Sequence, residues 1–398
     1  MLPTAMNAPN SASGPRSPAS GAAPIRVLHV LGGAERGGTE LWLLEVLRYM
    51  DAARFQSDLL VHRSGGPLQR QFSSLGVRVL CLDRTHPFRY CARLFRLLRR
   101  GGPYSVVHSH LHLYSGFVLR IARLAGVPCR IAHARNTSDG KSPTLLRGLY
   151  AGLMRRWLRA HATHLFAVSK AAAEATFGAE AASNAGCTVL SGIDTATYEA
   201  LPDRSRARAA ISLPLKTPLI GHVGSFRPQK NHRFLVEVAR ELLKLRKDAA
   251  FVFVGDGPLR AEIQRSLVAA GIASSVHLLG ERDGLPAIYR AMDAFVFPSL
   301  YEGLPRALLE AQAAGIPCLA SDTISREAIL RPGSVRLFPL AAGPAAWAGA
   351  LHDLVLLGPT SDPDRRATLR RLHALRLTAE ANAAALDAVY EQSRRGAR

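Results

Sequence analysis

Short apolar runs alternate with longer helical patterns along this chain, and the alternation occurs twice. The first set of runs is IRVLHVL (25–31), SDLLVH (57–62), VRVLCL (77–82), SVVHSH (105–110), CRIAHA (129–134) and HLFAVS (164–169). The second set is LIGHVGS (219–225), AAFVFVG (249–255), SVHLLG (275–280), AFVFPS (294–299) and PCLASD (317–322). Strands that alternate with helices favour a parallel sheet covered by helices on both faces.

The two sets predict an α/β chain with two doubly wound, Rossmann-like domains that face each other across a cleft. The 398 residues, 48% of them hydrophobic, suffice for two cores, since single cores stop growing at roughly 250–300 residues. Ligands of such folds bind outside the carboxyl ends of the strands. We expect a disordered tail over 1–24, an N-terminal domain over 25–202, a C-terminal domain over 203–376 and a closing helix over 377–398 that packs back on the N-terminal domain or braces the other.

Positive charge is concentrated in one part of the chain. The net charge is +21, and sixteen Lys and Arg stand against one acid, Asp139, between Arg84 and Lys170. Such a field attracts anionic lipid or other polyanions, although a solvated basic surface has the same composition. The helical stretches 87–100 and 144–161 mix Arg with aromatic and aliphatic residues. This mixture is typical of an interfacial helix on an anionic membrane, and equally of helices that cover a sheet.

The remaining composition bears on the location of the protein. The five cysteines form no CxxC pair or Cys/His cluster, which argues against disulfides and zinc and fits a cytoplasmic location. No run reaches the ~20 apolar residues that a spanning helix needs, and the tail does not have the pattern of a signal peptide. We therefore expect any membrane contact to be peripheral, on the cytoplasmic face.

The segment FPSLYEGLPRALLEAQAAGIPCLASD (297–322) joins two predicted strands through a helix with an unusual start. Gly303 permits a sharp turn, and Pro305 suits a first helical position because its missing N–H needs no partner there. The free N–H groups of residues 306–308 would then form an anion site suited to a diphosphate.

Two carboxylates, Glu302 and Glu310, accompany this helix start. Helical geometry would place them roughly 12 Å apart along the axis. The two carboxyl groups of a glycosidase are at most about 9.5 Å apart, so this pair does not fit catalysis at one bond. It fits the two ends of one ligand, such as the sugar and the ribose of a nucleotide sugar. A helix-stabilising Glu and a solvated Glu would have the same spacing.

A second predicted anion site follows the strand at 219–225. In GSFRPQKNH, Arg227 and Lys230 come directly after Gly224 and before the next helix. Two long cations would neutralise a leaving diphosphate, which is the role of a metal in other phosphate chemistry. A basic loop in a basic protein is the alternative.

The N-terminal half offers weaker signals. Gly37 and Gly38 separate the first predicted strand from its helix and indicate a tight turn near a phosphate or an acceptor, although the spacing is not GxGxxG. HSHLH (108–112) has the residue type of a metal cluster, but no acidic residue stands near it and we expect no metal. His133, at the end of the next strand, is the better candidate for a hydrogen bond to a ligand in the cleft.

Together these segments resemble the family 4 glycosyltransferases of the GT-B fold, especially the capsular and exopolysaccharide branch. The similarity extends over about residues 25–392, and the Glu-x7-Glu with its Gly-x-Pro start is its most specific part. The matching segments are GGTE, VVHSHLH, RIAHARN, AVSKAAAE, VLSGID, HVGSFRPQKNH, VGDGP, LLGERDGLPAIYRAMDAFVFPSLYEGLPRALLEAQAAGIPCLASD and ALDAVYEQ. The resemblance implies a retaining, metal-independent hexosyltransferase without a cofactor. It would move a sugar from a nucleotide-sugar donor, a UDP-sugar rather than a GDP-sugar, to a glycan or lipid-linked saccharide.

The resemblance also implies roles for the domains and for individual residues. The N-terminal domain would lie on the acceptor side, and the C-terminal domain would bind the nucleotide sugar. Glu302 would contact hydroxyls of the donor sugar, and Glu310 would hold the ribose. His133 would lie near the donor sugar, while Arg227 and Lys230 would hold the diphosphate. Further donor contacts are implied for Gly37, Gly38, Gly303, Leu304, Pro305, Arg306 and Ala307.

Two other functions remain compatible with parts of the sequence. A sugar-nucleotide epimerase or hydrolase on the same fold would convert the donor without an acceptor, but the chain shows no additional acid/base pair. A non-catalytic protein that binds nucleic acid or membrane follows from the charge alone. Residues 84–170 contain neither a nucleic-acid module nor an aromatic stacking pattern, so we do not expect nucleic acid as a partner.

Overall fold

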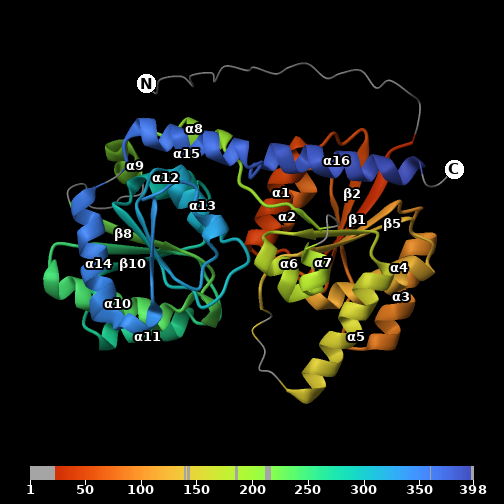
Figure 1. The fold of residues 1–398 in the computed structure, drawn as a ribbon, viewed down its shortest axis with the longest axis horizontal. Helices are drawn as coiled ribbons and strands as arrows, with labels where there is room; N and C mark the ends of the chain where they lie inside the picture. Colours follow the sequence, from red (N-terminus) through yellow and green to blue (C-terminus); the bar gives the residue numbers. More distant parts are fainter. Residues whose placement is uncertain are drawn as a thin grey trace, which may run out of the picture.

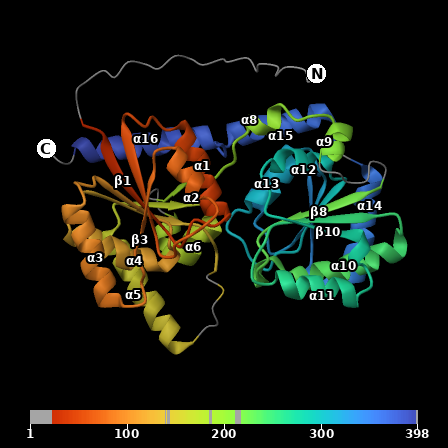
Figure 2. The same cartoon turned by 180° about the vertical axis from the view of Figure 1, so that it is seen from behind.

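The computed structural model describes residues 23–138, 140, 144–183, 187–210, 217–358 and 360–395. Two α/β halves lie side by side, each with a central sheet between layers of helices (Figure 1). The view from behind in Figure 2 shows the same two layered bodies. The expected fold class, two Rossmann-like domains, is therefore confirmed, while all but the last two residues of the expected tail over 1–24 lie outside the described residues.

The N-terminal half holds a seven-stranded parallel sheet with the order β3-β2-β1-β4-β5-β6-β7. Its strands are β1 (Ile25–Leu31), β2 (Phe55–Val61), β3 (Arg78–Cys81), β4 (Val106–Ser109), β5 (Cys129–Ala134), β6 (His164–Ala167) and β7 (Cys187–Val189). The helices are α1 (Gly38–Tyr49), α2 (Gln69–Ser74), α3 (Pro87–Arg100), α4 (Ser115–Leu124), α5 (Leu145–His161), α6 (Lys170–Phe177) and α7 (Ala179–Ser183), with the 3₁₀ turn η1 (His112–Tyr114). The strand order reverses between β1 and β4, so the loops that leave these strands diverge and open a crevice.

The C-terminal half holds a six-stranded parallel sheet with the order β10-β9-β8-β11-β12-β13. Its strands are β8 (Leu219–Val223), β9 (Ala250–Val254), β10 (Val276–Gly280), β11 (Ala294–Phe297), β12 (Cys318–Ser321) and β13 (Val335–Phe338). The helices are α8 (Ala196–Glu199), α9 (Arg204–Ala210), α10 (His232–Leu245), α11 (Arg260–Ala269), α12 (Leu285–Ala291), α13 (Arg306–Ala313) and α14 (Gly343–Leu357), with 3₁₀ turns η2 (Pro228–Lys230), η3 (Ala273–Ser275), η4 (Arg326–Ala328) and η5 (Leu340–Ala342). The four central strands are buried along their whole length, because helices cover both faces of a parallel sheet.

Two long helices at the end of the chain run along one side of both halves (Figure 1). These are α15 (Asp362–Ala374), on the C-terminal half, and α16 (Ala379–Arg395), on the N-terminal half. The Trp42 indole N–H of α1 donates a hydrogen bond to the Asn382 side-chain oxygen of α16 (2.8 Å). The Tyr390 hydroxyl bonds to His108 Nδ1 of β4 (2.8 Å). The last helix of the chain thus completes the core of the first half.

The chain crosses between the halves twice, and the two crossings touch. Ile193 N–H donates to the Leu377 carbonyl (3.2 Å), and Ala379 N–H donates to the Ile193 carbonyl (3.0 Å). A Cβ at Gly192 would lie 2.5 Å from the Leu377 carbonyl carbon. The missing side chain at position 192 therefore allows the two backbone segments to pack directly on each other.

The stretch Leu340–Leu357 is long and apolar enough by length and composition to cross a membrane, contrary to the sequence expectation that no run qualifies. Within α14, Trp347 and Leu351 are fully buried and belong to the C-terminal core. Leu356 and Leu357 at its end are exposed. Its buried face identifies α14 as a helix of the C-terminal core. A core helix can be as long and as apolar as a membrane-spanning helix.

The crossing at Gly192 gives a first prediction. Gly192→Ala should lower the melting temperature, because a Cβ this close to the Leu377 backbone forces both segments to shift, at a cost of about 1–3 kcal/mol. Gly349→Ala is the matched control, since a Cβ there meets nothing within 4 Å and alanine favours the α14 helix. Thermal unfolding of the purified variants measures both. Equal melting temperatures for Gly192→Ala and the parent would contradict the packing described here.

Candidate active site

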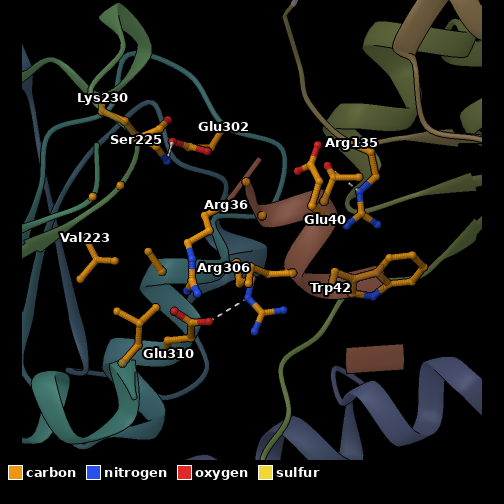
Figure 3. A pocket seen from close by; sticks show the side chains of 18 of the residues that line it. Arg36, Glu40, Trp42, Arg135, Val223, Ser225, Lys230, Glu302, Arg306 and Glu310 are labelled. Carbon is orange, nitrogen blue, oxygen red and sulfur yellow. Dashed lines mark hydrogen bonds and ion pairs between the residues drawn. The ribbon is translucent and has the colours of Figure 1, made fainter. Parts of the chain in front are cut away.

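A cavity of about 320 Å³ lies between the carboxyl ends of the two sheets. Both halves contribute to its wall, and Figure 3 shows the side chains of most of the residues around it. From the N-terminal half come residues 36–42 after β1, Arg135 and Asn136 after β5, Val168, Ser191 and Gly192. From the C-terminal half come residues 223–225, Gln229, Lys230, residues 254–256, Glu281, Arg282, Leu285, Glu302, Leu304, Arg306, Ala307 and Glu310. The cavity is where the fold was expected to bind a ligand.

Most of the predicted site residues belong to this wall. Eight of them line the cavity: Gly37, Gly38, Lys230, Glu302, Leu304, Arg306, Ala307 and Glu310. Four do not: His133, Arg227, Gly303 and Pro305. The wall also contains Arg36, Thr39, Glu40, Trp42 and Arg135, which sequence reasoning did not single out.

Glu302 lies in the loop between β11 and α13, four residues before the helix begins at Arg306. The helical spacing expected between the two carboxylates therefore does not apply. The Lys230 ammonium forms an ion pair with Glu302 Oε1 (2.6 Å), and both side chains are mostly buried. Gln229 holds the two loops together, because its side-chain amide donates to the Tyr301 backbone carbonyl (2.8 Å) and its backbone carbonyl accepts from Leu300 N–H (2.8 Å). The loop after β8 thus presents Lys230 beside Glu302.

Glu310 lies on the inner face of α13, 4% exposed. Its Oε1 accepts a hydrogen bond from Arg306 Nε (2.8 Å), and its Oε2 accepts one from the Tyr289 hydroxyl (3.0 Å). Burial raises the pKa of Glu310 above its ordinary value, against the lowering effect of Arg306. Arg306 also forms an ion pair with Glu45 of α1, in the other half of the molecule. The guanidinium therefore bridges the two halves at the base of the cavity.

The start of α13 differs in two respects from the sequence expectation. Leu308 N–H donates to the Pro305 carbonyl (3.0 Å), so it is not free to bind an anion, whereas residues 306 and 307 show no backbone N–H bond in the part of the chain that is described. Gly303 is needed for the close approach of its backbone to that of Arg135 rather than for a turn, because a Cβ there would lie 2.6 Å from the Arg135 carbonyl oxygen. Its own carbonyl accepts a hydrogen bond from Ser169 (3.1 Å).

Glu40, in the first turn of α1, places a carboxyl group against the loop that follows β1. A Cβ at Gly37 would lie 2.4 Å from Glu40 Oε2, so the carboxyl group lies directly over the glycine. Burial raises the pKa of Glu40 to about 7, against the opposing charges of Arg135 and Arg227. Arg227 itself is exposed and does not line the cavity, although its charge acts on this carboxyl group.

His133 lies one layer behind the cavity wall and is 1% exposed. Its Nε2 is 3.0 Å from the Leu190 carbonyl oxygen, and its Nδ1 is 3.2 Å from His108 Nε2. Arg135, two residues further along, reaches the cavity instead, with its guanidinium carbon 4.3 Å from the centre of the Trp42 ring. The sequence analysis selected His133, which is buried, and not Arg135, which lines the cavity.

Histidines gather beneath this wall. His29, His108 and His110 are buried, and one ring nitrogen of each lies within 4.8 Å of those of the other two, so the three could hold a metal ion. Sequence spacing did not reveal His29, which β1 places beside His108 of β4. His112 does not join them, because β4 ends at Ser109 and His112 has a positive φ of 51°. None of the three lines the cavity.

Comparison with known proteins identifies the family of the chain. Residues 217–356 match the family described as Glycosyl transferases group 1, and residues 37–190 match the Glycosyl transferase 4-like domain. The chain is 34% identical over 376 residues to a putative glycosyltransferase, EpsF, of Bacillus subtilis, which covers 92% of this chain and 97% of that protein. It is 28% identical over 313 residues to an Escherichia coli enzyme named UDP-Gal:alpha-D-GlcNAc-diphosphoundecaprenol alpha-1,3-galactosyltransferase, covering 75% of this chain and 79% of that one.

A solved structure shares the architecture. HepE of Anabaena, crystallised in complex with UDP-glucose, superimposes with a TM-score of 0.69 over 94% of this chain and 99% of its own. The sequence identity is 17%, so this likeness shows the fold alone. The matched families and the relative from Bacillus subtilis establish that the chain belongs to the group 1, or family 4, glycosyltransferases, and the solved structure agrees with their GT-B fold.

Proposed function

We propose that this glycosyltransferase takes a sugar from a UDP-sugar and transfers it, with retention of configuration, to a saccharide or lipid-linked saccharide of a capsular or exported polysaccharide. The observation that carries the proposal is that Glu302 and Glu310 line one cavity on either side of the start of α13. A nucleotide sugar has hydroxyls at both ends and a diphosphate between them. The names of the relatives support UDP as the carrier and a lipid diphosphate as part of the acceptor.

Each charged residue of the cavity has a role in this proposal. Glu302 accepts hydrogen bonds from hydroxyls of the donor sugar, and Glu310 accepts them from the ribose. Charge develops on the diphosphate as the bond to the sugar breaks, and Lys230 stabilises it together with Arg227 and the free N–H groups at the start of α13. The bond from the anomeric carbon to the phosphate oxygen breaks and UDP leaves. The bond from the anomeric carbon to the acceptor oxygen forms, and the hydroxyl proton of the acceptor passes to the departing diphosphate.

The two halves have different roles in this proposal. The C-terminal half, with Lys230 and both glutamates, binds the nucleotide sugar. The N-terminal half closes the donor site through the loop that starts α1 at Gly37 and Gly38, and it admits the acceptor from its own side. His133 lies behind the cavity wall and does not contact the sugar directly. It affects the donor site through the wall residues that cover it.

We further propose that the enzyme works at the cytoplasmic face of a membrane, bound there through α5. The first turns of α5 project from the body of the N-terminal half (Figure 1). Leu145 is 83% exposed and Leu146 79%, and Leu149 follows one turn later at 66%. Arginines follow on the same helix, so the surface combines apolar anchors with positive charge, as an anionic lipid surface requires.

Substitution of the two glutamates tests the donor site. Glu302→Gln should lower kcat by about 10²–10³-fold, because an interaction with the reacting sugar is lost. Glu310→Gln should chiefly raise KM for the donor, by roughly tenfold or more, because charged hydrogen bonds to the ribose are lost. Initial rates of UDP release with an acceptor measure both, and Glu262→Gln, a partly exposed acid on α11 that pairs with Arg233 away from the cavity, is the control. Undiminished transfer by Glu302→Gln would remove Glu302 from the mechanism, and UDP release that is independent of acceptor would indicate a hydrolase.

Transfer should not depend on a divalent metal. Lys230 and the start of α13 face the cavity where the diphosphate binds, whereas the histidine group of His29, His108 and His110 is not part of the wall. Dialysis against a chelator should therefore leave the rate of UDP release unchanged. Loss of activity that a divalent cation restores would contradict the proposal.

Membrane binding can be separated from catalysis. The triple variant Leu145→Ser, Leu146→Ser and Leu149→Ser should bind vesicles of phosphatidylglycerol at least about tenfold more weakly, because three apolar anchors are lost. UDP release with a soluble acceptor should be unchanged. Leu356→Ser with Leu357→Ser, at the exposed end of α14, is the matched control and should bind like the parent. Weaker binding by the control variant and unchanged binding by the triple variant would place the membrane contact on α14.

A further inference from the structure

The cations that line the cavity differ in how their charge is balanced. Three of them face carboxylates, in the pairs Lys230 with Glu302, Arg306 with Glu45 and Glu310, and Arg36 with Asp283 and Glu281. Arg282, a fourth, is exposed to solvent. Arg135 is partly buried, and no carboxylate oxygen of the described residues lies within 4.0 Å of its guanidinium.

The contacts of Arg135 hold its side chain in place without balancing its charge. Nε donates to the Thr39 hydroxyl (3.3 Å), one terminal nitrogen is 3.2 Å from His133 Nε2, and the guanidinium stacks over Trp42. Burial lowers the pKa of Arg135 to about 9, so the group stays protonated at neutral pH. The carboxyl group whose charge acts most on it is Glu40, which has a pKa raised to about 7 by burial and so balances the charge only in part. An unbalanced cation in a cleft is costly unless a ligand pairs with it.

The position of Arg135 identifies the part of the ligand that it faces. Its carbonyl oxygen packs against Gly303, directly after Glu302, and the Thr137 hydroxyl donates to the Glu302 carbonyl (3.0 Å). Figure 3 shows Arg135 beside Glu40 on the wall of the N-terminal half, across the cavity from Glu302 and Lys230. A donor sugar held by Glu302 therefore lies between that carboxylate and the Arg135 guanidinium. The diphosphate lies on the other side of Glu302, near Lys230.

We propose that the sugar transferred by this enzyme carries a carboxylate, as a hexuronic acid does, and that Arg135 binds it. The fork of a guanidinium matches a carboxylate with two parallel hydrogen bonds, which a hydroxymethyl group cannot offer. Thr39, His133 and Trp42 fix the orientation of the fork before the sugar arrives, so little entropy is lost on binding. A bound carboxylate also favours the neutral form of the nearby Glu40 carboxyl group. The inference rests on the proposed UDP-sugar donor.

Donor binding without any acceptor tests this inference, because an anionic acceptor then cannot contribute. Titration calorimetry would compare UDP, UDP-glucose, UDP-galactose, UDP-glucuronate and UDP-galacturonate on the parent protein, Arg135→Met and Arg135→Lys. The parent should bind one of the uronates roughly tenfold or more tighter than the corresponding neutral donor. Arg135→Met should bring that ratio to about one without weakening UDP, and Arg135→Lys should retain part of it. Arg123→Met, an exposed arginine of α4, is the control for loss of one positive charge.

The outcomes separate this inference from the function on which it rests. Preference of the parent for neutral donors would overturn the uronate assignment alone, as would a variant Arg135→Met that loses UDP and all donors equally while its melting temperature is unchanged. Failure of the folded parent to bind UDP or any UDP-sugar would overturn the proposed donor class, and the uronate assignment with it.

Discussion

Arg306 carries the interaction on which the arrangement of this molecule most depends. Its guanidinium lies between Glu45 of the N-terminal half and Glu310 of the C-terminal half, with only 12% of the side chain exposed. Burial alone would lower the pKa of Arg306, but the two carboxylates raise it above its ordinary value. Removal of one partner from a buried pair costs about 3–5 kcal/mol. The same contact therefore fixes α13 against α1 and sets the width of the cavity between the halves.

This bridge also leaves Glu310 able to accept further hydrogen bonds at the proposed donor site. Both oxygens of Glu310 accept a hydrogen bond, from Arg306 and from Tyr289, yet a carboxylate offers about four lone-pair positions. In the proposed function, ribose hydroxyls can therefore bind Glu310 without breaking the bridge to Arg306. At the other end of the site, Lys230 neutralises Glu302, so the negatively charged donor does not meet an unpaired carboxylate. Arg135 differs, because no carboxylate of the described residues lies close to its guanidinium.

Much of the fold could be predicted because periodicity and motif order are local properties. The eleven predicted strands correspond to β1–β6 and β8–β12, whereas β7 and β13 are short edge strands without a clear apolar run. The cavity wall was harder to predict. His133 in β5 and Arg135 just after it could not be ranked from the sequence, because only the packing of Trp42 and the α16 helix decides which side chain is covered. Gly303 was assigned to a turn, whereas the backbone of Arg135, from the other half, explains it.

The central claim is that the cavity binds a uridine nucleotide through the C-terminal half. Thermal unfolding of the parent protein with UDP, GDP and ADP, each from micromolar to millimolar concentration, tests it most directly. A ligand at about 100 times its Kd stabilises the folded state by about 2.7 kcal/mol. The account predicts that UDP raises the melting temperature and that GDP and ADP at equal concentration raise it less. No shift with any of the three, in a sample shown to be folded, would contradict it.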